Sequence, residues 1–106
     1  MAYKIHLINK YNYSFDARKG GPGVLQLWSD QNNVARVNFV ADNASVPAPV
    51  LAADLNSATI YFKEKSLPGL IDMLRNENPV KVTINNQPPG FVFVHTGQEP
   101  VGEGEV

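Results

Sequence analysis

Residues 66–96 have the sequence SLPGLIDMLRNENPVKVTINNQPPGFVFVHT, which divides into one helix followed by two strands. The apolar residues of the first part recur at positions i, i+3, i+4 and i+7, a spacing that predicts an amphipathic helix with one apolar stripe. These residues are Leu67, Leu70, Ile71 and Leu74. The hydroxyl of Ser66 is predicted to cap the start of the helix. The dipeptide Asn78-Pro79 predicts that the helix ends near Glu77.

The second part of this segment predicts a β-hairpin. Residues 80–85 alternate apolar and polar side chains, and the Gln-Pro-Pro-Gly run at 87–90 has turn-forming chemistry. The returning strand at 91–94, Phe-Val-Phe-Val, is apolar on both of its faces. One short helix covers only one of those faces. We therefore expect the other face to be covered either by a sheet that curls over itself or by a second molecule.

Four further strands are predicted before the helix. They lie at residues 3–9, 24–29, 34–41 and 58–63. The first strand alternates Tyr3, Ile5 and Leu7 with the polar residues Lys4 and His6. Because such alternation is typical of a half-buried strand, we expect its apolar members to point inward.

The segments between these strands differ in character. The run Asp-Gln-Asn-Asn at 30–33 predicts a hairpin turn, because Asn and Asp tolerate left-handed backbone. Residues 10–19 predict a short strand extension or an ordered loop, and the Gly-Gly-Pro-Gly run at 20–23 breaks regular structure. Residues 42–56 contain two prolines among apolar side chains, so we expect an irregular segment over one edge or end of the sheet.

The order of four strands, one helix and two strands, without β–α–β alternation, predicts the α+β class. We expect one domain over residues 1–96. Its architecture would be a twisted antiparallel sheet of five or six strands, able to curl into a half-barrel, with the helix packed on one face. Residues 97–106 contain Glu99, Glu103 and Glu105 without a basic residue, and predict a disordered acidic tail.

Composition excludes several classes of protein. The chain has 106 residues, of which 43% are hydrophobic and 18% charged, as expected for one globular domain. Without the three tail glutamates, nine basic residues face seven acidic ones, a weak excess for a nucleic-acid-binding domain. The absence of cysteine excludes disulfides and thiolate metal sites. No apolar run predicts a signal peptide or membrane span, so we expect a cytoplasmic protein without a membrane partner.

Catalytic motifs are not evident in the sequence. His6 and His95 are the two histidines, and neither has a second ligand at metal-binding spacing. We expect the His95 ring to be partly buried and bonded to a backbone carbonyl. Asp54 is the carboxylate with the most apolar neighbours, whereas the other aspartates fit turns. The glycine-rich run lacks the Gly-Lys-Ser/Thr ending of a phosphate-binding loop. The sequence therefore predicts no enzyme, no metal site and no cofactor.

The function that we expect is that of a binding or assembly module. The uncovered face of the last strand favours a homo-oligomer, most simply a two-fold dimer, or another protein partner. Large aromatic side chains at outward positions of the predicted sheet complete the candidate interface. Its residues are Trp28, Tyr61, Phe91 and Phe93.

An alternative function is binding of single-stranded nucleic acid. Cations interleaved with aromatic rings on a sheet face are typical of proteins that stack bases. The candidate residues for this face are Arg36, Tyr61, Lys63 and Lys81. The run of four strands followed by a helix also resembles the topology of the Whirly-like single-strand binders. This resemblance concerns the order of elements alone.

Overall fold

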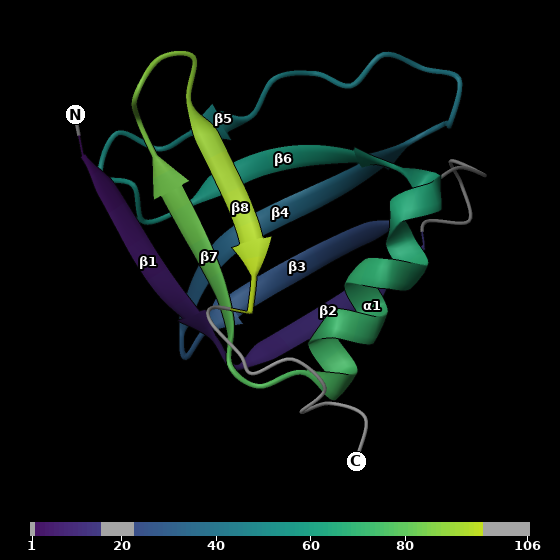
Figure 1. The fold of residues 1–106 in the computed structure, drawn as a ribbon, viewed down its shortest axis with the longest axis horizontal. Helices are drawn as coiled ribbons and strands as arrows, with labels where there is room; N and C mark the ends of the chain where they lie inside the picture. Colours follow the sequence, from purple (N-terminus) through teal and green to yellow (C-terminus); the bar gives the residue numbers. More distant parts are fainter. Residues whose placement is uncertain (1, 16–22, 97–106) are drawn as a thin grey trace.

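The computed structural model of the chain describes residues 2–15 and 23–96 (Figure 1). Within these ranges, eight strands, one 3-10 turn and one α-helix confirm the α+β class. The elements are β1 (Tyr3–Ile8), β2 (Lys10–Ser14), β3 (Val24–Ser29), β4 (Asn32–Val40), β5 (Val50–Leu51), β6 (Ala58–Lys63), η1 (Glu64–Ser66), α1 (Leu67–Asn76), β7 (Val80–Asn85) and β8 (Phe91–His95). The predicted acidic tail and the predicted break at 20–22 lie outside the described residues.

The strands form two sheets, whereas the sequence predicted one. The smaller sheet has the order β1-β7-β8 and is antiparallel, and the larger has the order β2-β3-β4-β6-β5. In the larger sheet, β4 and β6 are parallel. The reason is the connection 41–57, which returns the chain to the starting end of β4 and adds the short strand β5 beside β6. The six described strands before α1 are therefore divided between two sheets, and the four-strand run of the Whirly-like resemblance is not observed.

The two sheets are joined by a corner at Asn9. This residue alone separates β1 from β2, so the chain passes directly from one sheet into the other. The Asn9 side chain makes two hydrogen bonds to the β3–β4 turn. Its Nδ2 donates to Asp30 Oδ1 at 2.6 Å, and its Oδ1 accepts from the Asp30 amide at 2.9 Å. The predicted hairpin is confirmed, with its turn confined to 30–31 because Asn32 and Asn33 belong to β4. Asp30 has the left-handed φ of 53° that such turns need.

The core lies between the sheets and the helix. In Figure 1 the smaller sheet and α1 lie on the same side of the larger sheet. Leu25 and Val37 of the larger sheet and Val82 and Ile84 of the smaller sheet have no exposed surface. Leu70 of α1 is also buried, and the other stripe residues Leu67, Ile71 and Leu74 pack against the core. The predicted helix stripe is thus confirmed. No helix in the described part of the chain is long and apolar enough to span a membrane.

The start of the helix differs from the prediction. Ser66 has helical backbone angles, φ −81° and ψ −14°, and its side chain makes no capping bond. The predicted Ser66 cap was wrong because η1 precedes the helix and places Ser66 inside a continuous turn. The Asp42 carboxylate instead accepts a hydrogen bond from the Lys65 amide at 2.9 Å. Glu77 is the C-cap, where the sequence predicted the end.

The inward and outward faces of β1 are the reverse of the prediction. Tyr3, Ile5 and Leu7 are exposed, and His6 is turned toward the interior. The reason lies in the turn 52–57, which satisfies the inward polar side chains. His6 Nε2 donates to the Leu55 carbonyl at 2.9 Å, a bond that the alternation in the sequence could not reveal.

Candidate functional site

The outer surface of the smaller sheet is an ordered grid of nine side chains, which we call the β1–β7–β8 face. The register of the three strands aligns them in three rows. The rows are Tyr3, Asn85 and Phe91, then Ile5, Thr83 and Phe93, then Leu7, Lys81 and His95. The two outer strands supply all five large apolar members, and the central strand supplies three polar ones.

Five large apolar side chains on this face are exposed to solvent. The exposed fractions are 62% for Tyr3, 55% for Ile5, 54% for Leu7, 39% for Phe91 and 57% for Phe93. The Phe91 and Phe93 rings stack with centroids 6.2 Å apart and planes 9° apart. Together the five present on the order of 500 Å² of apolar surface, on two strands that flank the polar central strand. This is within the size range of the largest apolar patches on monomeric proteins, which are often functional.

The two faces of β8 therefore have different surroundings. Val92 and Val94 pack against the core, whereas Phe91 and Phe93 point outward and are 39% and 57% exposed. In Figure 1 the helix lies beside the smaller sheet, next to its β8 edge, and on the same side of the larger sheet. The open face that the sequence predicted for this strand is the β1–β7–β8 face, with β1 as an additional part.

His95 lies at one corner of this face. Its Nε2 atom is 2.8 Å from Thr83 Oγ1, on the neighbouring strand. The predicted backbone carbonyl partner for His95 was wrong, because the ring points away from the interior and the nearest polar group is a side chain of the same face. The ring is half-buried, as predicted.

The other predicted interface residues lie on the larger sheet. Trp28 of β3 and Tyr61 of β6 follow the buried residues Leu27 and Ile60, so they point to the outer surface of that sheet. This surface faces away from the smaller sheet. The structure thus separates Trp28 and Tyr61 from Phe91 and Phe93, and the four do not form one surface.

The residues predicted for nucleic-acid binding are also divided. Arg36 is paired with Thr59 and therefore shares the outer surface of the larger sheet with Tyr61 and Lys63. Lys81 is paired with Leu7 and His95, and belongs to the β1–β7–β8 face. Three of the four candidates are therefore brought together.

Asp54 has a structural explanation. Its Oδ1 accepts from the Asn56 amide at 3.0 Å and its Oδ2 from Asn56 Nδ2 at 3.2 Å. The Asn56 Oδ1 in turn accepts from Lys4 Nζ at 2.9 Å. Asp54 therefore shapes the turn that receives the inner side of β1, and its side chain is exposed.

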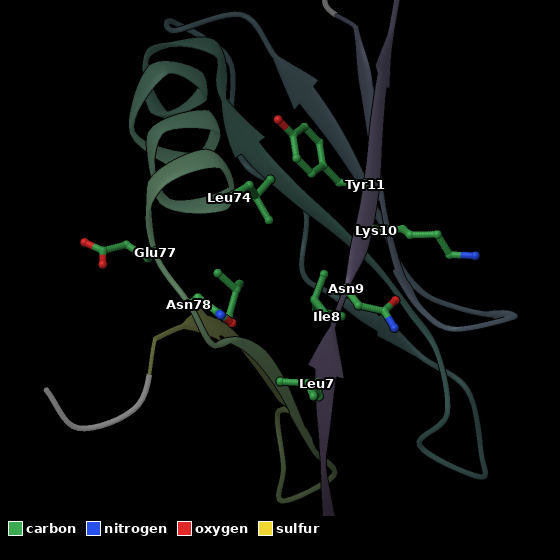
Figure 2. Close-up of a pocket in the computed structure, with 9 residues that line it drawn as sticks. Leu7, Ile8, Asn9, Lys10, Tyr11, Leu74, Glu77 and Asn78 are labelled. Carbon is green, nitrogen blue, oxygen red and sulfur yellow. The ribbon is translucent and has the colours of Figure 1, made fainter. Parts of the chain in front are cut away.

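A pocket of about 320 Å³ lies between the end of α1 and the corner where β1 continues into β2 (Figure 2). Its wall includes Ile8, Leu74 and the ring of Tyr11. The charged side chains of Lys10 and Glu77 point away from it in Figure 2. Neither this pocket nor a second one beside Arg36 is lined by a histidine or by Asp54. Within residues 2–15 and 23–96, no three His, Asp or Glu side chains are grouped closely enough to hold a metal ion.

The chain matches no family model, and no curated protein or solved structure matches it. The candidate sites therefore depend on the geometry of the chain itself. Sequence reasoning missed Tyr3, Ile5 and Leu7 as members of an open face. No local signal could have identified them, because an alternating strand has the same pattern whichever of its faces is buried.

Proposed function

We propose that this chain is a non-enzymatic assembly module that forms a homodimer through the β1–β7–β8 face. The observation that supports the proposal is the set of five exposed, large apolar side chains on the two outer strands of the smaller sheet. Exposed apolar surface of this extent is unfavourable in water, and its burial contributes roughly 25 cal/mol per Å² before the costs of association. A binding role accounts for a face that the protomer leaves open.

A second copy of the chain is the occupant that fits the size of the face. Stable interfaces bury about 800 Å² on each partner, with an apolar centre and a polar rim. The five apolar side chains supply more than half of that area, and the polar members of the face supply the rest. Because a two-fold interface uses the same patch twice, each copy would cover the apolar surface of the other.

The placement of charge on the face is compatible with self-association. The face contains no carboxylate, and Lys81 is its lysine, in the row at one end. In such a dimer the smaller sheets of the two copies face each other, and the two-fold axis lies between them, perpendicular to the strands. This axis places the Lys81 row of one copy over the Asn85 row of the other. The two lysines are then kept apart, Phe93 meets its own copy, and His95 lies over Phe91.

Light scattering after size exclusion tests the proposal. We expect a dimer at micromolar concentration, and we expect Phe93→Asp to be monomeric because it buries a charge in the apolar centre. The control is Val46→Asp, which adds the same charge at an exposed apolar residue between β4 and β5. A wild-type chain that stays monomeric at about 100 μM, roughly a hundredfold above a Kd of about 1 μM, would contradict the proposal. So would a Phe93→Asp variant that remains dimeric.

Three related expectations belong to the same proposal. A different protein could occupy the face, and a monomeric wild-type chain would favour that occupant over a second copy. A cytoplasmic location and the lack of a catalytic role stay predictions from the sequence. The stacked rings of Phe91 and Phe93 are the part of the face that either protein partner would bury first.

A further inference from the structure

The outer surface of the larger sheet carries a diagonal row of cations and aromatic rings, which we call the cation–aromatic stripe. Its members, in order across the sheet, are Lys10, Trp28, Arg36, Tyr61 and Lys63. Lys10 lies directly opposite Trp28 in the β2–β3 register. Arg36 follows on the next strand, and Tyr61 and Lys63 on the strand beyond it. Charge and aromatic surface therefore alternate along the stripe.

The outward orientation of the stripe is supported by its neighbours. Leu27, Val37 and Ile60 lie next in sequence to stripe residues and are buried in the core, so Trp28, Arg36 and Tyr61 must point the other way. The Asn33 Nδ2 also donates to Gln26 Oε1 at 2.5 Å across β3 and β4. This bond joins two side chains on the same surface as the stripe.

Within residues 2–15 and 23–96, no strand places a carboxylate beside the cations of the stripe. None of the described strands contains Asp or Glu, because the described acidic residues lie in turns, in η1, in α1 or just after it. Lys10, Arg36 and Lys63 therefore give this surface a local positive charge that the net charge of the chain hides. A positive surface attracts a polyanion, and the interleaved rings offer stacking platforms.

The dimensions of the stripe suit an extended strand. Strands are about 4.8 Å apart and alternate residues about 6.8 Å apart, so Trp28 and Tyr61 are separated by roughly 16 Å. Beside Arg36 lies a hollow of about 370 Å³, lined by polar Asn33, Ser57 and Thr59 and by apolar Val50 and Leu51. The hollow gives hydrogen-bonding groups and space next to the stripe.

We infer that the cation–aromatic stripe binds single-stranded nucleic acid. Trp28 and Tyr61 stack on bases, and Lys10, Arg36 and Lys63 contact phosphates. Bases in a duplex are stacked on one another and unavailable to the two rings, so the single strand is the form that fits. The inference does not depend on the dimer, because the stripe and the β1–β7–β8 face point away from each other.

Trp28 is the single tryptophan of the chain, so its fluorescence reports directly on the stripe. The probe is an oligothymidylate of roughly 12 nucleotides, within the usual size range of such sites. We expect quenching of Trp28 at low salt. With three phosphate contacts, the plot of log K against log salt concentration has a slope of about −2. Absence of quenching, or equal binding of a duplex of the same length, overturns the inference.

Variants separate stacking from charge. Tyr61→Ala is expected to weaken binding by about tenfold, the usual effect of losing one stacked base. Arg36→Ala is expected to reduce the salt slope by about 0.7. Lys81→Ala removes the same kind of charge from the other face, and Phe93→Asp removes the dimer; both should bind as the wild type does. An abasic oligonucleotide that binds as well as oligothymidylate, or a loss in Lys81→Ala equal to that in Arg36→Ala, overturns the inference.

Discussion

His6 Nε2 lies 2.9 Å from the carbonyl oxygen of Leu55, a buried residue whose φ is 60°. A carbonyl only accepts hydrogen bonds, so Nε2 carries the proton. The bond links the inner side of β1 to the turn before β6, and it holds Leu55 in a left-handed conformation that a leucine rarely adopts. Because His6 lies on the inner side of β1, Tyr3, Ile5 and Leu7 lie on the β1–β7–β8 face.

The first prediction concerns the stability supplied by His6. His6→Ala removes the Nε2 donor and leaves the Leu55 carbonyl without this hydrogen bond. We therefore expect the free energy of unfolding to fall by about 1–2 kcal/mol. The control is Lys4→Ala, whose bond to Asn56 is exposed and whose loss should change stability by less than about 0.5 kcal/mol. Urea denaturation measures both. Equal effects of the two substitutions would contradict the role given to the buried bond.

The fold class could be predicted from the sequence because it depends on local patterns. The helix stripe at Leu70, the hairpin turn at Asp30 and the alternation in β7 are each set by neighbours in the chain. The division into two sheets depends on pairing between distant segments, such as β4 with β6. Residues 42–56 carry no periodicity that reveals such a crossover, and this is why the parallel pair was not predicted.

The second prediction distinguishes the two candidate caps of the helix. Asp42→Ala removes the acceptor of the Lys65 amide and a negative charge near the start of α1, so we expect a loss of about 1 kcal/mol. Ser66→Ala removes no side-chain bond and should cost less than about 0.5 kcal/mol. Thermal unfolding followed by circular dichroism measures both variants. The opposite order of the two losses would restore the cap that the sequence predicted.

The third prediction tests which side of the smaller sheet is buried. Ile84 has no exposed surface, whereas Ile5 is 55% exposed. Ile84→Ala should therefore destabilise the protomer by roughly 3 kcal/mol, and Ile5→Ala by less than about 0.5 kcal/mol. Both are measured by urea denaturation in the Phe93→Asp background, which separates folding from assembly. A large loss for Ile5→Ala would show that β1 has the orientation that its alternation first predicted.

The candidate site could be predicted only in part. Phe91 and Phe93 were identifiable because a strand that is apolar on both faces requires packing partners on both faces. Ile5 and Leu7, which belong to the same face, were not identifiable, because an alternating strand has the same sequence pattern whichever of its faces is buried. The inward position of His6 is matched by its hydrogen bond to the carbonyl of Leu55, which lies 49 residues farther along the chain. Long-range hydrogen bonds of this kind leave no local mark in a sequence.

The fourth prediction compares two glycines that differ in the space around them. A Cβ on Gly69 would meet no atom within 4 Å, whereas a Cβ on Gly23 would lie 2.6 Å from the Ser14 carbonyl oxygen and 2.7 Å from the Tyr13 ring. Gly69 lies inside α1, where alanine loses less backbone entropy, so Gly69→Ala should stabilise the chain by about 0.5–1 kcal/mol.

Gly23→Ala should have the opposite sign. The added methyl group must push apart β2 and the start of β3, and overpacking of this kind costs roughly 1–3 kcal/mol. The urea midpoint of each variant is compared with that of the wild type. When the m-values are equal, the difference gives the sign of the change in stability. A stabilising Gly23→Ala would mean that the backbone near Ser14 can move away without loss. In that case the Ser14–Val24 end of the β2–β3 pair would be held less firmly, whereas Lys10 and Trp28 lie at the opposite end of the same pair, next to the Asn9 corner.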